Sequence, residues 1–303
     1  MLVHDLFSDM PIVDAHQHFW DPVANYHPWL CDQSPVPFRY GNYSALRRAY
    51  LPQDYAKDAE GHSIAATVYI EAEWQRGDAI KEMRYVEQLR TDSGFPTVAV
   101  AQAWLDSPDI EALLPQLASF PFVRGIRHKP RANPASDSDA PGGMMDSAWR
   151  RGYAKLADYG LRFDLQAPWW HLHEAAALAR DFPLTQIIVN HTGLPADRSS
   201  QGVCAWREAI KQVADYPNVA LKISGLGIEG QPWTVSGNQE IVLHAIEAFG
   251  VDRCMFASNY PVDGLCASFE TVFDGFAQIV QGLSHAEKRK LFHDNAIRIY
   301  AIR

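Results

Sequence analysis

The most informative stretch of the chain is Ile12-Val13-Asp14-Ala15-His16-Gln17-His18-Phe19-Trp20, which reads as a short buried strand ending in two histidines. Residues i and i+2 of a strand share a face, so His16 and His18 can converge on one metal ion or one substrate oxygen, with Asp14 below them. The chain holds 12 histidines, and an HxH pair also arises by chance. The rest of the sequence must therefore support a site here.

Further β-type runs follow this one, with helical segments between them. The predicted strands, eight in all, are 11–19, 65–72, 96–105, 123–128, 162–166, 187–192, 219–225 and 254–260. Apolar residues recur at helical spacing over 110–117 and 242–249. Ser107 is the predicted N-cap of the first of these helices, and Ser284 with Glu287 predicts a capping box before the last helix of the chain.

The alternation of strands and helices indicates the fold class. Eight strands alternating with helices over 303 residues favour a closed (β/α)8 TIM barrel over an open doubly wound sheet. Neither GxGxxG nor GxxxxGK[ST] is present to support the open sheet. We expect one domain over 1–303, with long βα loops above its carboxyl-terminal face.

The composition and charge of the chain limit the kinds of molecule that it is expected to bind. The net charge of −9 and the lack of a Lys/Arg cluster argue against nucleic acid. No apolar run approaches the roughly 20 residues that span a bilayer, and residues 1–5 lack the order of a secretory leader. The cysteines, Cys31, Cys204, Cys254 and Cys266, are far apart and predict neither disulfides nor a thiolate zinc site. We expect a cytoplasmic protein with a small-molecule partner; a homo-oligomer is left open.

Polar residues end several apolar strands, and in a barrel these ends meet at one mouth. The candidates are Glu71, Arg127-His128, Asp164-Leu165-Gln166, Asn190-His191-Thr192-Gly193, Lys222-Ile223-Ser224-Gly225 and Ser258-Asn259-Tyr260-Pro261. Taken singly, each could be a loop residue or a helix cap. Alternation cannot place Arg124, Arg127 and Lys129 all in the cavity, and we favour Arg127 as the one that binds a carboxylate. Trp29, in the aromatic segment 20–50 after the first strand, is a candidate ring contact.

A resemblance to a known family rests on motifs from the first strand to the last. These are Asp14-Ala15-His16-Gln17-His18-Phe19-Trp20-Asp21-Pro22, Tyr26-His27-Pro28-Trp29-Leu30, Gly125-Ile126-Arg127-His128, Asn190-His191-Thr192-Gly193 and Phe256-Ala257-Ser258-Asn259-Tyr260-Pro261-Val262. Together they resemble the amidohydrolase-related family of the amidohydrolase superfamily, most of all its lactonase branch of sugar-lactone and 2-pyrone-4,6-dicarboxylate hydrolases. The resemblance implies a TIM-barrel hydrolase whose first-strand HxH pair and sixth-strand histidine are His16, His18 and His191.

The strand-eight acid that this resemblance implies does not map onto the chain. The family pattern is Ser-Asp-Trp/Phe-Pro, whereas this chain has Asn259 in place of the acid. An amide cannot take a proton from water near neutral pH, so Asn259 is not a general base. Asp263 replaces the carboxylate only if the chain folds back after Pro261. His191 is our first choice of base and Glu71 our second.

The metal content is a separate question. A catalytic zinc site generally uses three protein ligands, and His16 with His18 supplies two. Gln166 stands where metal-rich relatives carry a histidine. Either Glu71 completes a site for one divalent ion, zinc first, or the histidines act as hydrogen-bond donors without metal; we lean slightly toward one ion. The second HxH pair, His171 and His173, is expected at the cavity rim or on a helix surface.

These expectations combine into one function with two alternatives. We expect hydrolysis of a lactone of a sugar acid or a related small carboxylated ring, with His16 and His18 polarising the carbonyl and His191 assisting water. Asn259 and Arg127 would orient the substrate. Further contacts to the substrate would come from His128, Glu71 and Trp29. The alternatives are a non-oxidative decarboxylase on the same barrel and a ligand-binding barrel that has lost catalysis.

Overall fold

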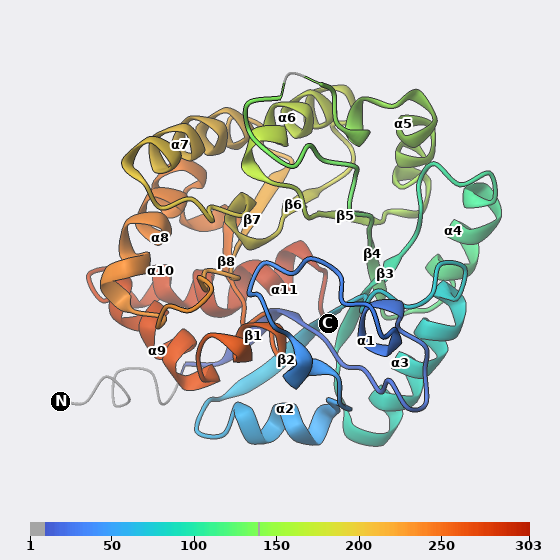
Figure 1. The fold of residues 1–303 in the computed structure, drawn as a ribbon, viewed down its shortest axis with the longest axis horizontal. Coiled ribbons are helices and arrows are strands. Elements are labelled where there is room, and N and C mark those ends of the chain that lie inside the picture. Colours follow the sequence, from blue (N-terminus) through green and yellow to red (C-terminus); the bar gives the residue numbers. More distant parts are fainter. Residues whose placement is uncertain (1–9, 139) are drawn as a thin grey trace.

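The computed structural model describes residues 10–138 and 140–303. Residues 1–5, on which the expectation about a secretory leader rests, lie outside this part. Eight parallel strands neighbour one another in chain order, and Figure 1 shows the helices following the same order around the outside. The predicted (β/α)8 TIM barrel is confirmed.

The elements have the following bounds. The strands are β1 (Ile12–Gln17), β2 (Ile64–Ile70), β3 (Val98–Gln102), β4 (Val123–Arg127), β5 (Arg162–Leu165), β6 (Ile187–Val189), β7 (Val219–Ile223) and β8 (Cys254–Phe256). The helices are α1 (Pro28–Cys31), α2 (Pro52–Asp58), α3 (Ala79–Ser93), α4 (Ile110–Ala118), α5 (Ser147–Ala154), α6 (Leu172–Asp181), α7 (Ser200–Ala214), α8 (Val235–Phe249), α9 (Phe269–Ile279), α10 (His285–Arg289) and α11 (Asn295–Ile299).

Each predicted strand is present, but the observed strands end earlier. β6 ends at Val189 and β8 at Phe256, because the polar residues that follow leave the ladder and enter the mouth of the barrel. The capping box before α10 is confirmed, with the backbone N–H of Ser284 donating to Glu287 Oε2 at 2.8 Å. The N-cap prediction at Ser107 was wrong: α4 begins at Ile110 and Asp109 holds the cap position without a side-chain bond.

The barrel closes at a seam between β1 and the chain just after β8. The backbone N–H of His18 donates to Tyr260 O at 2.8 Å, and that of Asn259 donates to His16 O at 2.8 Å. Each bond joins a residue of the first-strand motif to a residue of the strand-eight motif. The seam therefore sets two regions far apart in sequence side by side.

Asp14 clamps this seam from below. Its buried carboxylate accepts hydrogen bonds from the hydroxyl and the backbone N–H of Ser258, at 2.6 and 2.9 Å, and from Tyr55 Oη at 2.9 Å. Burial raises the pKa of Asp14, while these donors act to lower it. Because the Asp14 carboxylate bonds to Ser258 and Tyr55, it stabilises the seam and does not contact the cavity.

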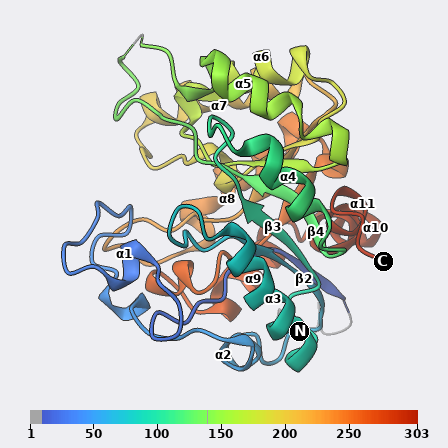
Figure 2. The same ribbon diagram turned by 90° about the vertical axis from the view of Figure 1, so that its right-hand side faces the viewer.

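The long loops lie at one end of the barrel. In Figure 2 the blue segment that carries α1 and the green segment after β4 extend to the left, while the C-terminus lies on the right. Trp29 and Phe38 of the first loop stack nearly parallel, with ring centroids 6.0 Å apart. In residues 10–138 and 140–303, no helix has the length and apolar character needed to cross a membrane.

Candidate active site

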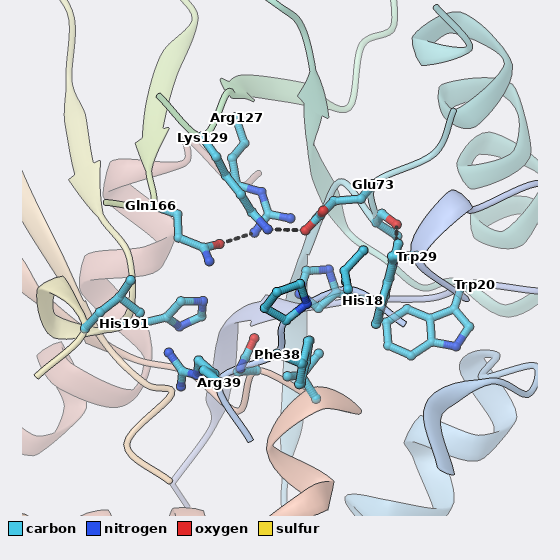
Figure 3. A pocket seen from close by; sticks show the side chains of 16 residues that line it. His18, Trp20, Trp29, Phe38, Arg39, Glu73, Arg127, Lys129, Gln166 and His191 are labelled. Carbon is cyan, nitrogen blue, oxygen red and sulfur yellow. Dashed lines mark hydrogen bonds and ion pairs between the residues drawn. The ribbon is translucent and has the colours of Figure 1, made fainter. Parts of the chain in front are cut away.

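A cavity of about 310 Å³ opens where the strands end. Its lining includes His18, Trp29, Arg39, Glu73, Arg127, Lys129, Gln166, His191 and Asn259. Figure 3 shows the labelled side chains converging from strand ends and from the long loop after β1. Concave sites at the carboxyl ends of barrel strands are where TIM-barrel enzymes place their chemistry. This cavity is the candidate active site.

Three imidazoles meet at its floor. The ring centroid of His16 lies 4.5 Å from that of His191 and 5.0 Å from that of His18. His18 and His191 line the cavity, whereas His16 is fully buried beneath it. The structure thus brings the three histidines together, but it differs from the expectation that His16 itself reaches a substrate carbonyl.

His18 is held as a neutral ring. Its Nδ1 lies 2.8 Å from the carbonyl oxygen of Ile70, which only accepts, so Nδ1 carries the proton and donates. Burial, helped by the charge of Arg127, lowers the pKa of His18 to about 3. The His18 Nε2 lone pair points to His16 Nε2, 3.2 Å away. Both ring nitrogens of His18 are therefore engaged within the protein.

His191 is the imidazole that faces the cavity with a ring nitrogen, Nε2, that bonds to no other described residue. Its Nδ1 lies 3.0 Å from Ser224 Oγ, and its ring points toward the middle of the cavity in Figure 3. Burial lowers the pKa of His191 well below its usual value, and the charges of Arg39 and Arg127 lower it further. A neutral His191 can accept a proton through Nε2 at neutral pH.

Arg127 is fixed at the cavity wall by three bonds. Its Nε donates to Glu71 Oε1 at 2.5 Å, one terminal nitrogen to Glu71 O at 2.6 Å, and the other to Gln166 Oε1 at 3.1 Å. A guanidinium has five N–H groups, so two stay available to a ligand. Glu71 is the partner of Arg127 and is absent from the cavity lining. Arg124 points to the other end of β4, where it donates to Ala301 O.

Charges at the cavity are mainly positive. Arg39, Arg127 and Lys129 line it together with one carboxylate, Glu73, which pairs with Lys129 (Figure 3). Arg39 comes from the long loop after β1 and donates to Gly225 O. This arrangement favours a ligand that is an anion or becomes one during the reaction.

His128 lies outside this cavity. Its Nδ1 accepts hydrogen bonds from Trp149 Nε1 at 3.0 Å and from the backbone N–H of Leu105 at 3.1 Å. It lines a neighbouring cavity of about 410 Å³ that shares Trp29 and Arg127 with the first. The structure thus separates His128 from the three histidines, while Trp29 borders both cavities.

Asn259 and Asp263 form a pair behind the cavity wall. The chain turns after Pro261 into a 3-10 turn, Val262–Leu265, which brings Asp263 Oδ1 to 2.6 Å from Asn259 Nδ2. Asp263 also accepts from Tyr40 Oη at 2.9 Å, and its burial raises its pKa. Asn259 lines the cavity and Asp263 does not. The fold-back occurs, but it places the carboxylate behind the amide.

Backbone strain is concentrated at this cavity. Among the described non-glycine residues, six have left-handed φ values, and four of these line the cavity: Glu73 at 53°, His191 at 53°, Leu194 at 59° and Asn259 at 55°. Such conformations are costly for residues with a Cβ and persist where the surroundings enforce them. No sequence pattern points to them, so their clustering is an independent indication of a functional site.

The described residues do not fit a zinc site with three protein ligands. The 3.2 Å between the Nε2 atoms of His16 and His18 suits two ligands on one ion, since Zn–N bonds are about 2.0 to 2.1 Å. However, among residues 10–138 and 140–303 no His, Cys, Asp or Glu, His191 included, completes a group of three that could hold a metal ion. Moreover, His16 Nδ1 faces the ammonium of Lys222 at 3.5 Å, where a metal-bound histidine needs an acceptor.

His171, the first residue of the second HxH pair, has a structural role. His171 is buried. Its Nε2 accepts from the backbone N–H of Asn133 at 2.9 Å, and its Nδ1 lies 3.0 Å from Glu174 Oε1. It ties the loop after β4 to α6. The expectation that His171 lies at the rim or on the surface was wrong, because the loop folds over it; His173 is exposed.

Comparisons with known proteins agree with this geometry. The model of the Amidohydrolase family matches residues 13–302. The uncharacterized protein y4mH of Sinorhizobium fredii is 38% identical, covering 97% of this chain and 100% of its own. An L-fucono-1,5-lactonase of Burkholderia multivorans is 26% identical over 96% of each chain. A crystal structure of a B. multivorans amidohydrolase with bound zinc superposes with a TM-score of 0.80 at 25% identity, covering 96% of this chain and 99% of that one.

Proposed function

The chain belongs to the Amidohydrolase family, and from this premise we propose that it hydrolyses a lactone of a sugar acid or a related small carboxylated ring, with His191 as the general base. The observation that carries the proposal is the placement of His191: a neutral imidazole aimed into a cavity whose charges are mainly positive. The relatives named as lactonases support the substrate class.

The first step is attack of water on the lactone carbonyl. His191 Nε2 takes a proton from the water as its oxygen bonds to the carbonyl carbon, and Ser224 Oγ accepts from His191 Nδ1 to stabilise the imidazolium. Arg127 lines the cavity, and its two spare N–H groups can donate to the oxyanion. His18, with both nitrogens engaged, packs beneath the ring as a fixed wall.

The second step is ring opening. The tetrahedral intermediate collapses, the bond between the carbonyl carbon and the ring oxygen breaks, and the proton on His191 moves to the departing alkoxide. The product is a hydroxy acid whose carboxyl group releases its proton to solvent, and the resulting carboxylate lies among Arg39, Arg127 and Lys129. Asn259 donates to Asp263 through Nδ2, so its Oδ1 is the amide atom left to orient a substrate hydroxyl.

No step in this scheme passes through a metal ion, because the described residues supply only two of the three ligands. The zinc in the B. multivorans crystal belongs to that protein's site. For this chain, one divalent ion remains an expectation from sequence.

The test is a substrate panel assayed in three ways. Acid release with a pH indicator is measured on L-fucono-1,5-lactone, other sugar lactones and 2-pyrone-4,6-dicarboxylate, and carbon dioxide release is measured on aromatic carboxylic acids. Thermal shift detects binding without turnover. We expect acid release that His191→Ala abolishes. Carbon dioxide release without lactone opening, binding without turnover, or full activity of His191→Ala would each overturn the proposal.

A further inference from the structure

A buried ion pair lies directly under the HxH motif. Lys222 Nζ donates to Asp164 Oδ1 at 2.6 Å, and both side chains are fully buried. Asp164 also accepts from Tyr300 Oη at 2.8 Å and from Asn190 Nδ2 at 2.9 Å. Buried charges are costly unless they are paired and hydrogen-bonded, and this pair meets both conditions. The ammonium is therefore held in one place.

The same ammonium approaches His16. Lys222 Nζ lies 3.5 Å from His16 Nδ1, and no other described side chain or backbone group bonds to that nitrogen. An ammonium has three donors and no acceptor. A proton on His16 Nδ1 would point at a positive charge, so the favoured tautomer carries its proton on Nε2.

This tautomer completes a directional chain of hydrogen bonds. Lys222 donates to His16 Nδ1, His16 Nε2 donates to His18 Nε2 at 3.2 Å, and His18 Nδ1 donates to Ile70 O at 2.8 Å. Each donor meets an acceptor along the whole path. The opposite tautomer of His16 would oppose a donor to Lys222 and leave two lone pairs facing each other at His18.

Metal-binding histidines have the reverse requirement. A histidine that binds a metal through Nε2 donates its Nδ1 proton to a carboxylate, a carbonyl or water. His18 meets this requirement through Ile70 O, whereas His16 faces a cation. We propose that Lys222 is a positioning residue that fixes His16 as the Nε2–H tautomer, so that the HxH pair is a closed hydrogen-bonded pair with weak affinity for divalent cations.

The inference goes beyond the proposed lactonase activity and holds for any carbonyl substrate. It explains how a chain with the HxH signature keeps both histidines neutral and fixed. It also leaves His191 as the imidazole available for proton transfer. Lys222 does not line the cavity, so its effect on the reaction passes through His16.

The first test measures zinc affinity. Zn²⁺ is titrated in competition with a chromophoric chelator into wild type and the double variant Lys222→Met/Asp164→Asn, which removes both charges and leaves neither buried alone. Loss of a supporting partner of a metal ligand typically changes affinity 10- to 100-fold, and we expect the double variant to bind Zn²⁺ about that much more tightly. Equal affinity in the two proteins would overturn the proposal.

Two control variants separate the effect of Lys222 from disturbance of its cluster. Tyr300→Phe and Asn190→Ala each remove one neutral donor to Asp164 and keep the ion pair, so the cation still faces His16. We expect zinc affinity within about threefold of wild type in both. Tighter binding in either control would assign the effect to disturbance of the cluster around Asp164 and reject Lys222.

The second test reads the tautomer directly in the wild-type protein. Long-range proton–nitrogen NMR of histidine-labelled wild type distinguishes Nδ1–H from Nε2–H rings, and His16→Gln identifies the signals of His16. We expect His16 with its proton on Nε2 and His18 with its proton on Nδ1. A proton on His16 Nδ1 would overturn the proposal whether or not lactones are hydrolysed.

Discussion

Asn259 Nδ2 donates to Asp263 Oδ1 at 2.6 Å, so the amide at the end of β8 is the partner of a carboxylate four residues later. The strand-eight pattern that the sequence resembles has an acid at this position, whereas here Asn259 lines the cavity and the carboxylate of Asp263 lies behind it. Asn259 and Asp263 therefore act as one unit. Changing either residue alone alters both.

This pairing predicts that restoring the family's acid fails. Asn259→Asp places two carboxylates within 2.6 Å of each other, so one must stay protonated or both must move apart. We expect a loss of about 2 kcal/mol of stability and no gain in turnover. Chemical unfolding and kcat measure these effects. The swap Asn259→Asp/Asp263→Asn keeps one acid and one amide and should recover the stability; a stable, faster single variant would contradict the pairing.

His191 should be required for turnover and dispensable for folding. Removing a positioned general base typically lowers the rate by about 10²- to 10⁴-fold. We expect His191→Gln to lose that factor in kcat, with Tm close to wild type. The control is His173→Gln, on an exposed helical histidine. Equal losses in both variants would remove His191 from the mechanism.

Gly225 should tolerate no side chain, because neighbouring atoms occupy the space that a Cβ would need. Its φ is +62°, and a Cβ there would lie 2.6 Å from a terminal nitrogen of Arg39 and 2.8 Å from His191 Nδ1. We expect Gly225→Ala to lower kcat at least 100-fold by displacing His191. Gly230 has a similar φ of +66° with nothing within 4 Å, so Gly230→Ala carries the same backbone strain without the contact. Its activity should stay near wild type, and a matching loss would show that strain alone is responsible.

The fork of Arg127 should hold the substrate. Lysine keeps the charge but has three donors on one atom, so the three bonds that fix Arg127 would leave it none for a ligand. We expect Arg127→Lys to raise KM for the lactone and Ki for the product acid about tenfold or more. Arg124→Lys, at the other end of β4, is the matched control. Unchanged constants in Arg127→Lys would place the anion elsewhere.

Stability should fall in mild acid. The pKa of His18 is about 3 in the folded protein and about 6.5 when unfolded, so between these values the unfolded chain binds more protons. The contribution of neutral His18 is complete above pH 6.5 and decreases as pH falls toward 3, by about 2 kcal/mol between pH 6.5 and 5.

The measurement is urea unfolding at several pH values. His18→Gln should show a shallower pH dependence than wild type, by up to one proton, while His285→Gln, on an exposed histidine, should follow wild type. Parallel curves for wild type and His18→Gln would show that His18 does not stay neutral.

The barrel was predictable because its signal repeats along the chain. Eight apolar runs with helical spacing between them leave few alternatives, and Arg127 was separable from Arg124 because they lie on opposite faces of β4. The strand ends were placed too late. At His191 and Asn259 the chain enters left-handed conformations that tertiary contacts enforce, and no local propensity predicts them.

Two other residues were expected near the mouth, but their roles were not predicted. Arg39 comes from an irregular loop with no periodicity to indicate which way its side chain points. Lys222 was expected among the polar strand ends, and its place between Leu221 and Ile223 in a buried strand indicated that it needs a partner. That partner, Asp164, is 58 residues away, and only the closed sheet brings the two together.

The seam between β1 and the chain after β8 has a consequence for biosynthesis. The backbone bonds that hold His16 and His18 come from Asn259 and Tyr260, which leave the ribosome some 240 residues after the histidines they support. A chain that is still being synthesised therefore contains His16 and His18 but lacks the residues whose backbone bonds hold them in place. Hydrolytic competence should arise in a single late event, when the last strand docks, and not grow gradually during translation.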